Sequence, residues 1–279
     1  MVRRLALSSA LLFLALMAWG VLTAEPGNDF HFSIIGDRTG RAAPEVYRSV
    51  WREVALLGPA FAINAGDTIE GGVDGRAERE WAEVEADWRP YRSFPFYLVA
   101  GNHDIWSDRS RRIFEKVNGR PAHYSFVHQD ALFVVLDNSR TEDLDEQQLR
   151  FLESELKANR GRAPKFVFFH KPYWLLYLKV GSGEFPLHRL ARQYGVNYVV
   201  SGHGHQFVRL ARDGVVYLEI GSSGGDMSRG LSRGEGFADG WFYHHAWVRV
   251  KGSEARVTIR ELGPPHGQGR IFDAESFGR

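Results

Sequence analysis

Residues 96–104 read FYLVAGNHD, an apolar run that ends directly in Gly, Asn, His and Asp. The run from Phe96 to Ala100 is short and wholly apolar, as expected of a buried strand. Turns after such strands usually carry small polar residues, but this one adds an imidazole and a carboxamide that contribute little to packing. The stretch therefore indicates a functional site, with Asn102, His103 and Asp104 as its first candidates.

Four other segments share this layout, in which an apolar strand runs into a turn that carries a possible ligand. They are Ile35-Gly36-Asp37, Ala65-Gly66-Asp67, Phe168-Phe169-His170 and Ser201-Gly202-His203-Gly204-His205. Alone, a Gly-Asp pair is commonly a turn whose Asp caps a helix, and a lone His is commonly a hydrogen-bonded core residue. Because parallel strands bring their carboxyl ends to the same edge, the five segments together predict one metal site. Oxygen and imidazole ligands suit manganese, iron or zinc.

Apolar runs alternate with helical stretches between these segments. The expected strands are His31–Ile35, Phe61–Asn64, Phe96–Ala100, Tyr124–Val127, Leu132–Leu136, Phe166–Phe169, Tyr198–Val200, Phe207–Leu210, Val215–Ile220, Ala246–Val250 and Arg256–Leu262. The expected helices are Ala43–Leu57, Arg76–Trp88 and Asp145–Ala158. This mixture predicts an α/β protein in which one or two sheets are covered by helices.

The composition allows one large core, since 44% of the 279 residues are apolar. We expect a single domain over residues 29–265 and a C-terminal tail over 266–279.

The 35 basic and 34 acidic residues leave a net charge of +1, which gives no reason to expect binding to long nucleic acids. The chain has no cysteine, which excludes disulfides and thiolate metal ligands.

The first residues differ from the rest of the chain. Arg3 and Arg4 precede an apolar stretch over residues 5–21, and polar residues follow from Glu25. This order is typical of a secretory signal peptide, here over residues 1–24, and predicts export to the periplasm or secretion. The alternative is an uncleaved anchor in which residues 5–21 attach the body to a membrane.

The five segments resemble the calcineurin-like metallophosphoesterase superfamily, whose pattern is D-x-H, G-D, G-N-H-D/E, a single His and G-H-x-H. The resemblance extends from about Phe32 to Phe207. It implies a four-layer sandwich of two packed mixed β-sheets flanked by helices, and a centre of two divalent metal ions. It also implies that Asp37 and His205 bind the first metal, that Asp67 bridges, and that Asn102, His170 and His203 bind the second.

One position departs from the family pattern. The first motif reads Asp37-Arg38-Thr39, so Thr39 stands where the family has its histidine. A threonine hydroxyl is a poor neutral ligand, and we expect water or a substrate oxygen to complete the first metal site. Purple acid phosphatases as a class also lack this histidine, but the tyrosine that serves them has no identifiable counterpart here.

The activity that the resemblance implies is hydrolysis of phosphomonoesters or phosphodiesters by a hydroxide that two metals activate. His103 is the candidate general acid and Asp104 its expected partner. Asn102 and His103 are also candidates for substrate contact. Arg38 could reach a phosphate oxygen, although pairing with a carboxylate is an equal alternative.

Two other functions remain open at this level. The missing histidine favours a non-catalytic metal- or phosphate-binding module, and the same kind of site also serves nucleases. The arginine-rich run over residues 108–112 is typical of a solvated helix start. Specificity should belong to four rim loops, and the sequence does not choose their substrate. These loops are Ile69–Gly75, Trp106–Arg112, Trp174–Glu184 and Gly221–Gly240.

Overall fold

The structure, a computed structural model, describes residues 27–91, 93–181, 184–227, 236–263 and 265–278. The expected leader over 1–24 lies outside these residues, so export and anchoring stay predictions. Among the helices in the described ranges, none is both long enough and apolar enough to cross a membrane.

The first sheet has six strands in the order β12-β11-β10-β1-β2-β3. They are β1 (Asp29–Ile35), β2 (Phe61–Asn64), β3 (Phe96–Tyr97), β10 (His244–Lys251), β11 (Glu254–Gly263) and β12 (Gly267–Asp273). Strands β1, β2 and β3 are parallel, whereas β10, β11 and β12 add antiparallel strands beyond β1. The carboxyl ends of β1, β2 and β3 therefore share one edge of the sheet.

The second sheet has the order β4-β5-β6-β7-β9-β8. Its strands are β4 (Tyr124–His128), β5 (Ala131–Val135), β6 (Lys165–Phe168), β7 (Tyr198–Ser201), β8 (Phe207–Arg212) and β9 (Val215–Ile220). Here β5, β6, β7 and β9 are parallel, and β4 and β8 pair antiparallel to their neighbours. Both sheets are thus mixed, as expected.

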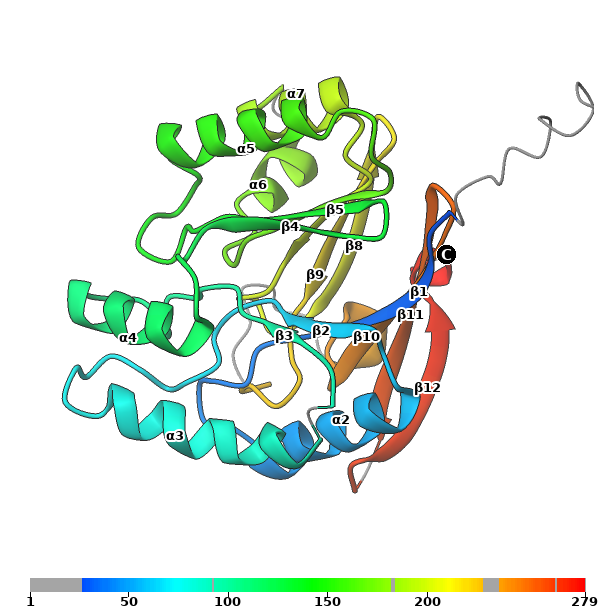
Figure 1. Ribbon diagram of the computed structural model, residues 1–279. Helices are drawn as coiled ribbons and strands as arrows, with labels where there is room; N and C mark the ends of the chain where they lie inside the picture. Colours follow the sequence, from blue (N-terminus) through cyan, green and yellow to red (C-terminus); the bar gives the residue numbers. More distant parts are fainter. Residues whose placement is uncertain (1–26, 92, 182–183, 228–235, 264, 279) are drawn as a thin grey trace, which may run out of the picture.

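The two sheets pack face to face over an aromatic core. Phe32 of the first sheet meets Phe133 and Phe166 of the second edge to face, with ring centroids 5.3 and 5.2 Å apart. Helices cover both outer faces (Figure 1). The first sheet is covered by α2 (Pro44–Leu57), α3 (Ala77–Trp88) and α4 (Asp108–Asn118), and the second by α5 (Glu146–Ala158), α6 (Trp174–Val180) and α7 (Pro186–Tyr194). This is the four-layer sandwich that the family resemblance implied.

Local sequence signals explain where several helices begin. Ser107 caps α4 by accepting from the backbone N–H of Ser110, and the Ser110 side chain returns the contact. Asp145 caps α5 in the same way through the N–H of Gln148. Such caps satisfy backbone donors that the first turn leaves without partners. The helix start expected at Asp108 is confirmed.

Two expectations about loops and tails differ from the structure. The segment expected to be a tail, 266–279, instead contributes β12, which pairs with β11 and brings Phe272 and Phe277 against the core. Its start, Gly-Gln-Gly-Arg, gives no strand pattern, because an edge strand needs few apolar residues. The expected rim loop over Trp174–Glu184 contains helix α6, whose nearly uniform apolar composition hides any helical period.

One buried histidine predicts a pH dependence of stability. Burial lowers the pKa of His244 to about 4, although the hydrogen bond from its Nδ1 to the Phe242 carbonyl acts in the opposite direction. Its Nε2 has no partner among the described residues. The unfolded chain, with a histidine pKa near 6.5, then binds more protons between these two values, so stability falls as pH falls through that window. We expect His244→Leu to remove about 2 kcal/mol of this loss between pH 7 and 4.5.

Urea unfolding of both proteins at the two pH values measures this difference. The substitution itself costs about 1 kcal/mol at pH 7, because it removes one hydrogen bond. Protonation of other groups is common to both proteins and cancels. Identical pH dependence in the two proteins would contradict the assignment.

Candidate metal centre

Three candidate ligands follow the parallel strands of the first sheet. Asp37, Asp67 and Asn102 lie just beyond β1, β2 and β3, and both aspartates are almost completely buried. Oδ1 of Asp67 accepts a hydrogen bond from the backbone N–H of His103 at 2.9 Å, which joins the loop after β2 to the loop after β3. The first sheet thus supplies the oxygen ligands.

The second sheet supplies the nitrogen ligands. His170 follows β6, and His203 and His205 follow β7. The backbone N–H of His203 donates to Asp37 Oδ2 at 2.7 Å, so the loops of the two sheets are joined directly. The candidate ligands therefore come from the facing edges of two sheets rather than from the single sheet edge that the sequence suggested.

The side chains converge as two groups that share one carboxylate. Asp67, His170 and His203 form one group, and Asp37, Asp67 and His205 form the other. In each group the possible ligand atoms all lie within 4.8 Å of one another. A shared aspartate between two such groups is the arrangement that a bridging carboxylate requires.

Backbone carbonyls fix the orientation of the imidazoles. Nδ1 of His170 lies 2.8 Å from the Ala65 carbonyl, and Nδ1 of His205 lies 2.6 Å from the Asp226 carbonyl. Each Nδ1 therefore carries the proton, which leaves Nε2 as the free lone pair directed into the site. His203 Nδ1 lies 3.2 Å from His170 Nε2, so two nitrogens approach the same point.

The donor set fits divalent cations. Oδ1 of Asp37 and Oδ1 of Asn102 are buried and have no hydrogen-bond partner among the described residues. Buried polar atoms normally have partners, so these two oxygens need one that the protein itself does not provide. Two carboxylates, a carboxamide and three imidazoles are suitable ligands for manganese, iron or zinc.

The electrostatics of the site are dominated by burial and by the Asp67–His170 contact, 3.1 Å between Oδ2 and Nε2. Burial raises the pKa of Asp37 well above its ordinary value and lowers that of His203 to about 4. Burial also opposes the charged forms of Asp67 and His170, but their mutual attraction prevails: it lowers the pKa of Asp67 and raises that of His170 to about 9. A cation bound there would displace that proton, because ligation needs neutral imidazole.

The ligand loops are held in uncommon backbone conformations. Asp67, His203 and His205 all have positive φ, at 53°, 77° and 56°. Such conformations cost about 1–3 kcal/mol each and persist where the surrounding structure imposes them, frequently at functional sites. Two motif glycines allow neighbouring loops to approach the aspartates closely. A Cβ at Gly101 would overlap Asp67 Oδ1, and a Cβ at Gly202 would overlap Asp37 Oδ1.

The expected pairing of Asp104 with His103 is wrong. The Asp104 carboxylate accepts three backbone N–H groups, those of Thr68, Ile69 and Gly101. It therefore binds the loop after β2 to the loop after β3, and burial raises its pKa to about 7.

The backbone carbonyl of Glu70 takes the place expected for Asp104. It lies 2.6 Å from Nδ1 of His103, so it orients that ring. The sequence could not indicate this contact, because any residue has a carbonyl.

Arg38 lies near a carboxylate, and Thr39 is buried. The Arg38 guanidinium lies 3.8 Å from the Asp87 carboxylate on α3 and 5.6 Å from the ring centre of Tyr47. This matches the alternative of a carboxylate partner. Thr39 is fully buried, and its Oγ1 has no hydrogen-bond partner among the described residues.

The first part of the loop expected at Gly221–Gly240 belongs to the site. The N–H groups of Ser223 and Gly225 donate to the Asp37 carbonyl, and the Asp226 carbonyl faces His205. Residues 228–235 lie outside the described ranges.

Asn138 was not identified from the sequence. Its Oδ1 accepts from the N–H groups of His170 and Lys171, both at 3.1 Å, so it fixes the loop that carries His170. Asp137-Asn138 follows strand β5 just as the identified motifs follow theirs, and this layout was the available signal.

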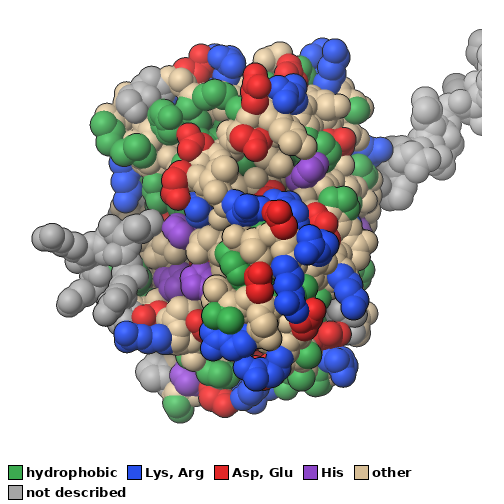
Figure 2. Space-filling model, turned by 90° about the vertical axis from the view of Figure 1, so that its left-hand side faces the viewer, with side chains coloured by type: hydrophobic (Ala, Val, Ile, Leu, Met, Phe, Trp, Pro, Cys, Tyr) green, Lys and Arg blue, Asp and Glu red, His purple; other side chains and the backbone are tan. Residues whose placement is uncertain are grey.

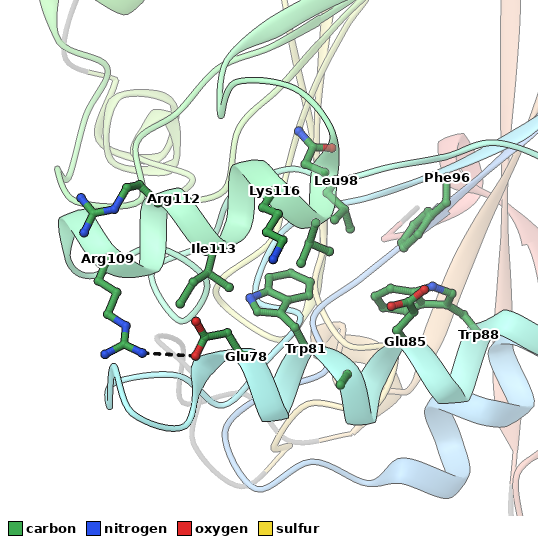
Figure 3. A pocket seen from close by; sticks show the side chains of 13 residues that line it. Glu78, Trp81, Glu85, Trp88, Phe96, Leu98, Arg109, Arg112, Ile113 and Lys116 are labelled. Atoms are coloured by element: carbon green, nitrogen blue, oxygen red, sulfur yellow. Dashed lines mark hydrogen bonds and ion pairs between the residues drawn. The ribbon is translucent and has the colours of Figure 1, made fainter.

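Histidine side chains group on the face of the molecule shown in Figure 2. A pocket of about 830 Å³ lies elsewhere, between α3 and α4. Trp81 and Trp88 rise from α3 toward Ile113 and Phe96, and Arg109 reaches across to Glu78 at 3.2 Å (Figure 3). None of the candidate ligands lines this pocket, so it is a groove between two helices.

The sequence was compared with known proteins. The profile of the calcineurin-like phosphoesterase family matches residues 28–207, which is more than half of the chain. The chain belongs to the calcineurin-like phosphoesterase family. It is accordingly a metallophosphoesterase, a hydrolase that acts on phosphoric ester bonds, as the sequence motifs predicted.

Related proteins agree with this membership. This phosphoesterase is 24% identical over 302 residues to tartrate-resistant acid phosphatase type 5 of Homo sapiens, which covers 90% of this chain and 87% of that protein. Its fold is similar to purple acid phosphatase PPD1 of yellow lupin, with a TM-score of 0.66 and 14% identity over 88% of this chain. The match covers 54% of the lupin chain, about half its length. GAP50, the anchor in the inner membrane complex of Plasmodium, shares the fold with a TM-score of 0.62, 14% identity and 88% of each chain covered.

Proposed function

We propose that this phosphoesterase hydrolyses phosphoric esters at a centre of two divalent cations. Asp37 and His205 would hold the first cation, Asp67 would bridge, and Asn102, His170 and His203 would hold the second. The observation that carries the proposal is the pair of ligand groups that share Asp67. The unpartnered oxygens of Asp37 and Asn102 support it independently.

Two cations at this centre would activate a water molecule and polarise the phosphoryl oxygens. The reaction forms a bond from the water oxygen to phosphorus and breaks the bond from phosphorus to the ester oxygen, which leaves as an alcohol. The residues of the chain position these partners: Asp67 stands between the two groups, and backbone carbonyls hold the imidazoles. His103 donates from Nδ1 to the Glu70 carbonyl, so in its imidazolium form it would carry a second proton on Nε2, which passes to the leaving oxygen and leaves the neutral ring.

Metal analysis and an ester panel together test the proposal. The protein should retain about two manganese, iron or zinc ions per chain and hydrolyse 4-nitrophenyl phosphate or bis(4-nitrophenyl) phosphate. Removal of metal by a chelator should abolish turnover, and added metal should restore it. Retention of metal without hydrolysis of either ester would contradict the catalytic role.

His103→Ala should separate esters by their leaving group. An alkoxide needs a proton as it leaves, whereas 4-nitrophenolate does not. We expect kcat/KM for an alkyl phosphate to fall about 10²- to 10⁴-fold, and that for 4-nitrophenyl phosphate to fall less than about tenfold. Steady-state kinetics of the two esters measures the difference.

His31→Ala is the matched control. His31 stacks on Trp247 near the start of β1, at the opposite end of the strand from Asp37. This variant should hydrolyse both esters at the wild-type rate. Equal losses on both esters in His103→Ala would argue against a general acid and for a role in holding the loop.

A further inference from the structure

A second pocket opens directly beside the candidate metal centre. It has a volume of about 470 Å³, and His203 forms part of its wall. This size lies within the range of about 300–1,000 Å³ that is common for small-molecule sites. A phosphate held next to His203 would therefore have its organic group close to this pocket.

The opposite wall of the pocket is apolar. It consists mainly of helix α6 and the two residues before it, which contribute Pro172, Tyr173, Leu175, Leu176 and Val180. Leu176 and Val180 are 66% and 68% exposed. Surface helices usually present polar residues to water, and Leu176 and Val180 depart from that pattern.

The face of the molecule shown in Figure 2 combines hydrophobic side chains with histidines. The hydrophobic side chains group at its upper left, above the histidines. Two lysines also line the pocket, and Lys171 lies 3.0 Å from the exposed carboxylate of Glu142. Glu142 lines the pocket as well, so the charged part of its lining consists of two lysines and one carboxylate. The pocket thus offers an apolar surface beside charged groups of net positive charge, which suits an anionic ester with a hydrophobic organic group.

We propose that this pocket holds the organic group of the substrate, and that the preferred substrates are phosphoesters of hydrophobic aryl or alkyl alcohols. The proposal rests on the proposed function, since the phosphate must occupy the metal centre. Sugar phosphates gain nothing from the apolar wall, because their hydroxyl groups would lose water there without finding partners. Burial of a few methylene groups in such a pocket is expected to raise kcat/KM about 10- to 100-fold.

The test compares phenyl phosphate with 4-butylphenyl phosphate, whose leaving groups are chemically alike and differ mainly in apolar size. We expect the wild-type protein to favour the butylphenyl ester by at least about tenfold in kcat/KM. Leu176→Asp and, separately, Val180→Asp should reduce this preference to about twofold or less. Both should leave the metal content unchanged, and both should lower kcat/KM for phenyl phosphate much less than that for the butylphenyl ester, because the smaller group covers less of the apolar wall.

Leu56→Asp is the matched control. Leu56 is a leucine on α2 that is 88% exposed and does not line the pocket, so this variant should keep the preference. Thermal unfolding of all three variants checks that the substitutions leave the fold intact. We expect the thermal midpoints to stay close to that of the wild type, because Leu176 and Val180 are exposed.

The outcomes separate the two proposals. Equal kcat/KM for the two esters in the wild-type protein, or an unchanged preference in both pocket variants, would overturn the pocket assignment and leave the proposed function standing. Failure of the metal-loaded protein to hydrolyse either ester would overturn both. Loss of activity on phenyl phosphate together with loss of metal in a pocket variant would show that α6 supports the centre rather than the substrate.

Discussion

Asp67→Asn should remove both bound metal and phosphoester hydrolysis. Asp67 belongs to both ligand groups, so one substitution weakens both at once. The variant also removes the negative charge beside His170, whose Nε2 lies 3.1 Å away. We expect the metal content to fall to less than about one ion per two chains and kcat/KM to fall about 10³-fold or more.

Elemental analysis and steady-state kinetics on one preparation measure both effects. Glu53→Gln is the control, because Glu53 is a largely buried carboxylate that pairs with Arg260 at 2.6 Å and is not among the candidate ligands. This control should keep its metal and its activity. Full activity in Asp67→Asn would remove the bridging assignment.

The sequence identified the candidate ligands because each motif follows a recognisable apolar strand. Each candidate follows an apolar strand, and the parallel strands β1 and β2 bring their carboxyl ends to one edge as expected, whereas β6 and β7 belong to the other sheet. The four-layer architecture followed from the resemblance and from the alternation of strands and helices. The sequence did not show which strands belong to which sheet, because strand order and sheet assignment depend on contacts between distant residues.

The errors have a common physical cause. Asp104 was assigned to His103 because the two are neighbours in the chain, but its carboxylate binds backbone N–H groups up to 36 residues away. The true partners of His103 and His205 are the carbonyls of Glu70 and Asp226. Backbone groups have no sequence signature, so the second layer of contacts around a site becomes visible only in the folded chain.

Gly202→Ala is expected to disable the centre without changing any ligand. A Cβ at this position would overlap Asp37 Oδ1 and would lie 2.8 Å from the Ala65 carbonyl. Both neighbours are fixed by the strands that carry them, so Asp37 or the loop with His203 and His205 must move. Displacement of a catalytic group by about 1 Å costs about 10²-fold in rate, and we expect at least this loss in kcat/KM together with weaker metal retention.

Gly161→Ala separates this contact from a general effect of adding a methyl group. Gly161 has no neighbour within 4 Å of an added Cβ, and neither glycine has a φ in the left-handed region, so backbone strain is the same in both variants. Gly161→Ala should retain metal and turnover, and it should leave the thermal midpoint within a few degrees of wild type. If Gly202→Ala also retained metal and turnover, the close contact between Gly202 and Asp37 would not be what positions Asp37, Asp67 and His205.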